Sequence, residues 1–359
     1  MNVCFLLGGF QSNGGIGRVT SILANALSEQ KNITIHTVAY CHTRRPMLYT
    51  LSEQVHQHHL FTAPTPMVKA ILLGNAITKL REILVQEHID VLVAAGALFY
   101  PLAILASRGT ATKCICWEHT NPASTADHRF QGWCRRYAVR RTHKLVVLTR
   151  SAAQYYTETL KIKPEKLVQI YNPIDPVENP AVYDDTATRM IAVGRLAYPK
   201  HFDRLISIAA RCLKDHPQWS LDIYGKGEDR PKLEKQIHSL GMEGRIHLMG
   251  QVDDLYDRYS QYAFQVMTSR YEGFPMSLLE GGSHRLPLIA FNVPTGPDEI
   301  IVDGENGFLV DAHDDARMES CILRLMNDPA LRQQMSETSY RLARRFHMSD
   351  ILNQWCEIL

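Results

Sequence analysis

Short apolar segments recur along the chain, and each is followed by a glycine-rich or polar loop and then by a helical pattern. An apolar run of about four to eight residues is typical of a parallel strand, because helices cover both faces of a parallel sheet. Repeated alternation of this kind predicts βαβ units in a doubly wound parallel sheet. The predicted strands lie at 3–7, 33–39, 91–95, 114–117, 145–148, 190–193 and 263–268, and within 221–227 and 246–252.

The length of 359 residues exceeds what one hydrophobic core normally holds, so we expect an α/β protein of two domains. A segment rich in proline, asparagine and aspartate, 170–188, separates the two series of alternating elements and is typical of a linker. We therefore predict a first domain at 1–175 and a second at 188–344. The tail, 345–359, patterns as one further helix.

Composition narrows the class of protein. A formal net charge of +2 argues against a nucleic-acid-binding function. Residues 1–8 are too short and uncharged for a signal peptide, and no apolar run approaches the roughly 18 residues of a membrane span. The eight cysteines are scattered, and Cys114 and Cys116 do not have the spacing of a zinc or redox motif. We expect a globular protein of a reducing cytoplasm.

The segment that carries most chemistry runs from Glu272 to Glu280. It follows a predicted strand, and Pro275 suits the first turn of a helix. Eight helical steps would separate the two carboxylates by about 12 Å. The catalytic carboxylates of glycoside hydrolases lie closer, at about 5–5.5 Å in retaining enzymes and about 6.5–9.5 Å in inverting ones. Two carboxylates at this distance could bind two different parts of one elongated ligand. The free amides after Pro275 could bind an anion. The alternative is one loop glutamate and one solvated helix glutamate.

The stretch from Ser269 to Glu280, Ser-Arg-Tyr-Glu-Gly-Phe-Pro-Met-Ser-Leu-Leu-Glu, resembles the signature of the retaining glycosyltransferases of family 4. The resemblance implies the GT-B fold, with two Rossmann-like domains facing a cleft. It also implies an acceptor-side first domain, joined by the helix 345–359, and a nucleotide-sugar-binding second domain. In that family, the position of Glu280 holds the ribose hydroxyls, and that of Glu272 holds the donor sugar with Gly273 and Phe274 beside it.

Gly194-Arg195 and Lys200 follow another predicted strand. A guanidinium fork and an ammonium five residues apart could clamp a diphosphate, although surface Arg and Lys are usually solvated. The resembling family carries the same Gly-Arg-x-x-x-x-Lys, normally followed by glycine. Here His201 takes the place of that glycine, which puts the local turn in question. The resemblance further implies that backbone at Val252 holds the nucleotide base.

Two candidates lie in the first domain. A glycine-rich turn, with Gly15 and Gly17, separates the first strand from the first helix, where the backbone can approach a phosphate or sugar. It lacks the third glycine of a dinucleotide fingerprint, and a simple tight turn remains an alternative. His119 follows a strand at the carboxyl edge, where open α/β sheets bind ligands. Either it faces the donor, as in the resembling family, or it is an ordinary loop histidine.

The segment 129–141 patterns as a basic helix with Phe130, Trp133, Cys134 and Tyr137 on one stripe. Such a helix could lie on an anionic membrane surface, or its aromatic stripe could pack on the core while Arg135, Arg136 and Arg140 are solvated. His56, His58 and His59 lie in a segment, 46–66, that has no clear period and is expected to be irregular. Their spacing matches no known ligand set, so no metal site is predicted.

We therefore predict a metal-independent retaining glycosyltransferase without a cofactor. It would move a sugar from a nucleotide diphosphate sugar, with UDP favoured, to a glycan or lipid-linked acceptor in cell-surface polysaccharide synthesis. Its place would be the cytoplasm, with the inner membrane face as a docking surface. The expected catalytic residues are Glu272, His119, Arg195 and Lys200. Two alternatives stay open: a nucleotide-sugar epimerase of the same fold, and a non-catalytic nucleotide-sugar-binding partner.

Overall fold

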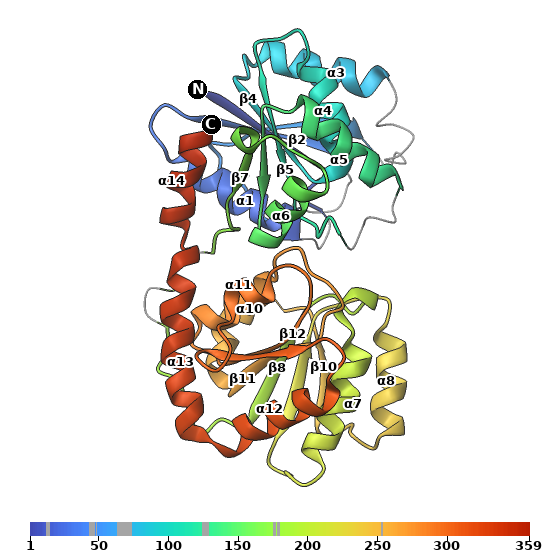
Figure 1. Cartoon of the computed structure of the whole chain (residues 1–359), viewed down its shortest axis with the longest axis vertical. Coiled ribbons are helices and arrows are strands. Elements are labelled where there is room, and N and C mark those ends of the chain that lie inside the picture. The colour runs from blue at the N-terminus through green and yellow to red at the C-terminus, as the bar shows by residue number, and fades with distance from the viewer. Residues whose placement is uncertain are drawn as a thin grey trace. The chain divides into compact units, whose positions relative to one another are not determined.

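The computed structural model describes residues 1–11, 15–42, 47, 49–62, 74–123, 129–174, 177, 180–252 and 254–359. The chain divides into two compact units (Figure 1). The first comprises Met1–Asp175 with Phe346–Leu359, and the second comprises Pro176–Arg345. Among the described residues, no helix combines the length and the apolar character needed to cross a membrane.

The first unit is built on a seven-stranded sheet in the order β3-β2-β1-β4-β5-β6-β7, with every neighbouring pair parallel. Its strands are β1 Asn2–Leu7, β2 Thr34–His42, β3 His56–Thr62, β4 Val91–Ala95, β5 Lys113–Trp117, β6 Lys144–Val147 and β7 Leu167–Gln169. Its helices are α1 Gly15–Ser28, α3 Gly74–Gln86, α4 Tyr100–Ser107, α5 Arg129–Arg141, α6 Arg150–Glu158 and α14 Met348–Ile358.

Helices cover both faces of this sheet. Buried side chains of α3, α4 and α5 pack on the face that carries Cys4 and Leu6. On the other face, Trp355 of α14 is fully buried, with its ring centroid 4.9 Å from Trp117 and 6.4 Å from Phe5. Figure 1 shows α14 beside α1, so the end of the chain completes the core that the first strand begins.

The structure corrects the irregular segment expected at 46–66, because His56–Thr62 forms the edge strand β3. This strand has the burial pattern of a half-exposed edge, and only Leu60 is fully buried. An edge strand needs few apolar residues, since it is covered on fewer sides than a central strand. Its histidine-rich sequence therefore hid it from a search for apolar runs.

The second unit repeats the plan with a six-stranded sheet in the order β10-β9-β8-β11-β12-β13, again with parallel pairs. Its strands are β8 Arg189–Val193, β9 Ser220–Tyr224, β10 Ile246–Gly250, β11 Phe264–Met267, β12 Leu288–Asn292 and β13 Gly307–Asp311. Its helices are α7 Phe202–Leu213, α8 Arg230–Ser239, α9 Leu255–Arg258, α10 Met276–Ser283, α11 Pro297–Ile300, α12 Asp315–Asn327 and α13 Pro329–Ala343.

Both sheets change direction of winding between their first and fourth strands, and both therefore have the doubly wound order that the sequence predicts. The switch lies between β1 and β4 in the first unit and between β8 and β11 in the second. Ligands of open α/β sheets bind outside the carboxyl ends of the strands at such a switch. The candidate residues can therefore be judged by their distance from these two points.

Candidate active site

Lys200 and Glu272 meet at the switch point of the second sheet. Lys200 ends the short turn Tyr198–Lys200 after β8, and Glu272 lies in the loop after β11. The Nζ of Lys200 donates to Glu272 Oε1 at 2.6 Å, and Ser269 Oγ donates to the same oxygen at 2.6 Å. The two side chains are only 21% and 11% exposed. A partly buried ion pair therefore stands where the fold places a ligand.

Backbone contacts hold these two loops together. The amide of Arg270 donates to the carbonyl of Pro199 at 2.8 Å, and Thr268 Oγ1 donates to the carbonyl of His201 at 3.1 Å. The pairing of Lys200 with Glu272 thus rests on a fixed frame and does not depend on two long side chains alone.

Gly194 leaves room for the stem of Lys200. A Cβ at this position would lie 3.0–3.2 Å from three carbons of the Lys200 side chain. A side chain at this position would therefore be in tight contact with the stem of Lys200, which would have to shift by a few tenths of an ångström.

His201, which stands where the resembling family normally has glycine, adopts a backbone conformation typical of glycine. His201 adopts φ 55° and ψ 38°, the left-handed conformation that glycine takes at no steric cost, and it directly precedes α7. Burial lowers the pKa of His201, with the nearby Arg270 guanidinium adding to the effect, so the ring is neutral at pH 7. The substitution changes the strain of the turn but does not add a charge to the site.

Arg195 and Val252 both lie at the carboxyl edge of the second sheet, after β8 and β10, which are separated by β9. Arg195 follows β8 directly, is exposed, and its side chain makes no hydrogen bond or ion pair with the residues that the structure describes. Val252 is half-buried two residues after Gly250, which ends β10 at φ 76°. Arg195 is therefore available to an incoming anion, whereas Lys200 must share its ammonium with Glu272.

The loop that carries Gly273 and Phe274 is held in place by the segment that follows β12. Thr295 Oγ1 donates to the carbonyl of Glu272. Gly296, at φ 104°, packs so closely that a Cβ would lie 2.4 Å from Pro275. Helix α10 starts at Met276, one residue later than Pro275 suggests. The amide of Met276 is already bonded to the carbonyl of Phe274, so anion binding at this end would fall to the next amide.

Glu280 is buried within α10 and is 2% exposed. Tyr259 donates its hydroxyl to Glu280 Oε2 at 3.2 Å, and His284 Nδ1 donates to the Glu280 carbonyl at 2.8 Å. Burial lowers the pKa of His284, and its ring stacks on Tyr259 at 4.8 Å. The alternative of a solvated helix glutamate is therefore wrong. The glycine that follows packs on β11, because a Cβ at Gly281 would overlap the Gln265 side chain.

His119 lies two residues beyond the end of β5 in the first unit, with its ring 4.1 Å from that of Trp117. Burial lowers the pKa of His119 to about 3, an effect that neighbouring Glu118 only partly opposes. Its Nε2 is buried without a hydrogen-bond partner among the described residues. His119 is therefore a neutral ring at pH 7, able to exchange a hydrogen bond but not to supply positive charge.

A cavity of about 270 Å³ opens at the switch point of the first sheet. Its lining is largely apolar and includes Gly8, Gly9, Gly17, Gly96, Thr120 and Gln131. Gly15, the first residue of α1, is exposed, and the remainder of the predicted turn, 12–14, lies outside the described residues. Gly17 thus borders a pocket at the expected edge of the sheet.

A buried ion pair that the sequence did not predict lies beside this cavity. Arg135 Nε donates to Glu118 Oε2 at 2.7 Å, and Tyr156 donates its hydroxyl to the same oxygen at 2.7 Å. Arg135 and Glu118 are each 1% exposed. Burial by itself would raise the pKa of Glu118, but the charge and hydrogen bonds of Arg135 hold it below its usual range.

The expectation that Arg135 is a surface charge of the basic helix is therefore wrong. A helix with many arginines gives no local signal as to which arginine faces inward. The signal that could have found it is the single acid, Glu118, that follows an apolar strand. A carboxylate at that place needs a cationic partner.

Two family descriptions match nearly the whole chain. "Glycosyltransferase Family 4" matches residues 13–178, and "Glycosyl transferases group 1" matches residues 178–342. The chain belongs to glycosyltransferase family 4. This is a retaining family with the GT-B fold, so the resemblance and the fold predicted from the sequence are confirmed.

Relatives of this family 4 chain are distant. It is 26% identical over 356 residues to an uncharacterised glycosyltransferase of Haemophilus influenzae, covering 99% of each chain. It is 26% identical over 362 residues to the amylovoran biosynthesis glycosyltransferase AmsD of Erwinia amylovora, covering 99% of this chain and 98% of the other.

Solved structures share its fold at lower identity. Staphylococcus aureus TarM in complex with UDP superposes with a TM-score of 0.81 at 14% identity and covers 99% of both chains. Anabaena HepE in complex with UDP-glucose superposes with a TM-score of 0.81 at 17% identity, covering 100% of this chain and 99% of the other.

Proposed function

We propose that this family 4 glycosyltransferase transfers a sugar, with retention of anomeric configuration, from a UDP-sugar to a glycan or lipid-linked acceptor in cell-surface polysaccharide synthesis. The observation that carries the proposal is the Lys200–Glu272 pair at the switch point of the second sheet. A carboxylate and an ammonium held together at this point could bind a donor that has hydroxyls at one end and phosphates at the other. AmsD, named for amylovoran biosynthesis, supports the class of product, and the UDP complexes of TarM and HepE support the donor nucleotide.

The proposed donor site lies in the second unit. Lys200 and Arg195 stabilise the charge that develops on the diphosphate as the glycosidic bond breaks. Glu272 accepts hydrogen bonds from the sugar hydroxyls, with the backbone of Gly273 and Phe274 alongside. Glu280 accepts bonds from the ribose hydroxyls, and the backbone at Val252 holds the base. When phosphate oxygens arrive, Lys200 exchanges part of its contact with Glu272 for them, which frees the carboxylate for the sugar.

The proposed reaction needs no nucleophile from the protein. The acceptor hydroxyl oxygen forms the new bond to the anomeric carbon on the face from which the diphosphate leaves. The bond between that carbon and the phosphate oxygen breaks, and the hydroxyl proton passes to the departing phosphate. We propose that the two cations perform the role that a metal would otherwise take.

Residues of the first unit complete the proposal. Neutral His119, with its unpaired Nε2, exchanges a hydrogen bond with the donor. Gly15 and Gly17 allow the chain to approach it closely. The largely apolar cavity that Gly17 borders belongs to the acceptor-recognising unit.

We also propose that α5 docks on an anionic membrane surface on the cytoplasmic side. Trp133 is 43% exposed and stacks between Phe130 and Tyr137, at 5.8 and 5.4 Å. The guanidinium of Arg141 lies 4.3 Å from the Tyr137 ring. Arg141 also lines a cavity of about 580 Å³ with Arg108, His143 and Lys166, and none of its described lining residues is an acid. One exposed aromatic ring, Trp133, flanked by two half-buried rings and by cations, is suited to a lipid headgroup region.

The function is tested with purified protein and a panel of UDP- and GDP-sugars. A donor that raises the melting temperature is then incubated with and without acceptor extracts. We expect sugar transfer that needs the acceptor and that falls in Lys200→Ala. Conversion of the donor to an epimer without acceptor would instead show the epimerase, and donor binding without turnover would show a binding partner.

A further inference from the structure

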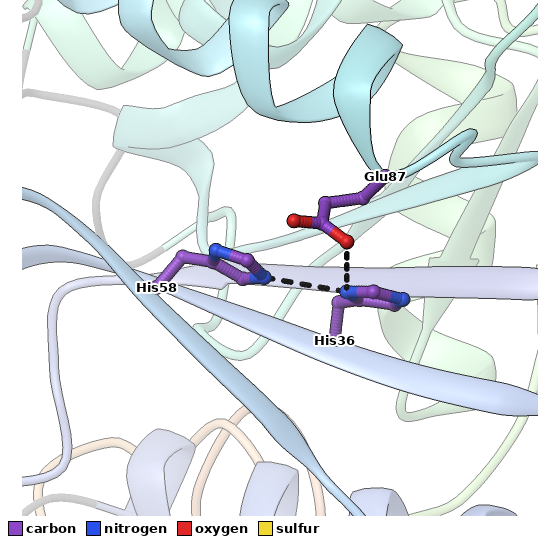
Figure 2. A group of neighbouring side chains, drawn as sticks. All are labelled: His36, His58 and Glu87. Carbon is purple, nitrogen blue, oxygen red and sulfur yellow. Dashed lines mark hydrogen bonds and ion pairs between the residues drawn. The ribbon is translucent and has the colours of Figure 1, made fainter.

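Two histidines and a glutamate converge at the amino-terminal edge of the first sheet. His36 is the third residue of β2, His58 is the third residue of β3, and Glu87 follows the end of α3. Figure 2 shows the two imidazoles directed toward one another, with the Glu87 carboxylate next to His36. This edge is opposite to the carboxyl edge that carries His119 and the glycine turn, so the proposed reaction makes no use of the group.

The strand register explains why these side chains share one face. His36 is paired with His56 across β2 and β3, and residues two apart on a strand point the same way, which places His58 beside them. The same register pairs His36 with Cys4 of β1. The imidazole of His56 stacks on that of His36 at 4.8 Å. Three adjacent strands therefore direct histidine and cysteine side chains toward the end of α3.

The distance between the two imidazole nitrogens matches that between two ligands of one metal ion. His36 Nδ1 and His58 Nε2 are 3.3 Å apart. Two nitrogens bound to one tetrahedral zinc at about 2.0–2.1 Å are separated by about 3.3–3.4 Å. Glu87 Oε2 lies 4.0 Å from His36 Nδ1, and all three donor atoms lie within 4.8 Å of one another. A small movement of Glu87, whose side chain is 39% exposed, would bring the carboxylate to bonding distance.

The donor groups are of the types that bind a divalent transition metal. Imidazole nitrogens bind metals in their neutral form, and Glu87 adds a carboxylate beside them.

We infer that His36, His58 and Glu87 form a binding site for a divalent transition metal of the zinc class. Two imidazoles and a carboxylate match the ligand set of zinc with one position left for water. The half-exposed side chains of His58 and Glu87 give the ion a route from solvent. Bound metal would tie the edge strand β3 to β2 and to the end of α3. The inference concerns stability and is independent of the proposed transfer reaction.

The test uses the full chain, purified without a polyhistidine tag and stripped with a chelator. Zn²⁺ is titrated while the melting temperature is followed, and Co²⁺ is titrated while visible absorption is followed. We expect Zn²⁺ at saturation to raise the melting temperature by about 5 °C. We expect bound Co²⁺ to give the intense bands of a tetrahedral site.

The decisive variants are His58→Ala and Glu87→Gln, and the matched control is His59→Ala. Each of the first two should weaken Zn²⁺ binding at least about tenfold. His59 is the next residue on β3, points to the other face and contacts His42, so its variant should bind as the wild type does. Circular dichroism of the metal-free variants should match that of stripped wild type. An equal Zn²⁺ effect in wild type and in His58→Ala would overturn the inference, as would no effect in wild type or its loss in His59→Ala.

Discussion

At the scale of single residues, the ion pair of Lys200 and Glu272 is the feature on which the proposed reaction depends. The two side chains are 72 positions apart and bond at 2.6 Å. Either partner can bind a different part of a sugar nucleotide, and their mutual contact keeps both in place before the donor arrives. Substitutions at this pair should therefore affect turnover more than stability.

Removal of either proposed phosphate-binding cation should lower the turnover number. A charge-assisted hydrogen bond contributes about 1.5–3 kcal/mol, so Lys200→Ala and Arg195→Ala should each lower kcat by roughly 10- to 100-fold. Lys214→Ala, at an exposed lysine just after α7, is the control and should leave kcat unchanged. Steady-state kinetics with one UDP-sugar measure all three. Values within twofold of wild type in both site variants would remove these residues from the mechanism.

The two glutamates should give different kinetic defects. Glu280→Gln removes a ribose contact made in ground and transition states alike, so it should raise the donor KM about tenfold with kcat nearly unchanged. Glu272→Gln misplaces the sugar and releases Lys200, so it should mainly lower kcat. The same assay compares both. The opposite pattern would reverse the proposed assignments.

At the scale of elements, α5 has two faces with different roles. Its inner face carries Cys134, Arg135, Ala138 and Val139 in the core. Its outer face carries Trp133 and the exposed arginines Arg129, Arg136, Arg140 and Arg141. The alternative in which the aromatic stripe packs on the core and the arginines are solvated fails for Arg135, which is buried, and for Trp133, which is exposed. Docking on a membrane stays a prediction.

Loss of Arg135 should destabilise the first unit. Removing one partner of a buried ion pair costs about 3–5 kcal/mol, so Arg135→Ala should be much less stable than Arg136→Ala, the exposed control. Because the pKa of Glu118 is lowered in the folded state, its stabilising effect is present above the unfolded carboxyl pKa of about 4.3 and is lost as pH falls through the folded value. Denaturant melts from pH 7 down to pH 3 measure both. Equal stability of the two variants at pH 7 would contradict the buried pair.

Membrane docking by α5 should depend on its outer face only. Charge reversal at Arg136, Arg140 and Arg141 should release the protein from anionic liposomes at low salt, since each cation near such a surface contributes about 1 kcal/mol. Trp133→Ala should weaken binding to a smaller extent, and neutral liposomes serve as the control. Liposome sedimentation gives the bound fraction. If wild type never sediments with anionic liposomes, the outer face has another use.

At the scale of the whole molecule, two doubly wound units each place candidate residues at a switch point. The family accounts for both units, and each carries its own candidate groups. The proposed reaction uses Lys200 and Arg195 in place of a divalent ion. The inferred metal site is on the opposite edge of the first sheet and would affect stability instead.

Chelation should therefore separate stability from turnover. With a chelator present we expect sugar transfer at 25 °C to continue at the wild-type rate, because the cations of the second unit supply the charge. The melting temperature should fall in the same sample. Transfer rate and thermal melt on one preparation test this. Loss of transfer that is restored by Mn²⁺ or Mg²⁺ would show that the reaction needs a metal.

The sequence by itself determined the type of fold and the segments that carry the chemistry. Periodicity is local, so buried strands such as β1 and β4 could be predicted from neighbouring residues. The family could be identified from the Glu272–Glu280 segment because this motif is also local: all of its residues lie in one loop and the helix that follows. The edge strand β3 could not be found in this way, since its exposed histidines lack an apolar pattern.

Only the tertiary structure decided which distant residues meet. The bond between Lys200 and Glu272 depends on β8 lying next to β11, and the group of His36, His58 and Glu87 depends on the register of β2 with β3. The burial of Arg135 depends on a carboxylate 17 positions away. Strand order and register are set by the packing of the whole sheet, so no local pattern in the chain reveals these contacts.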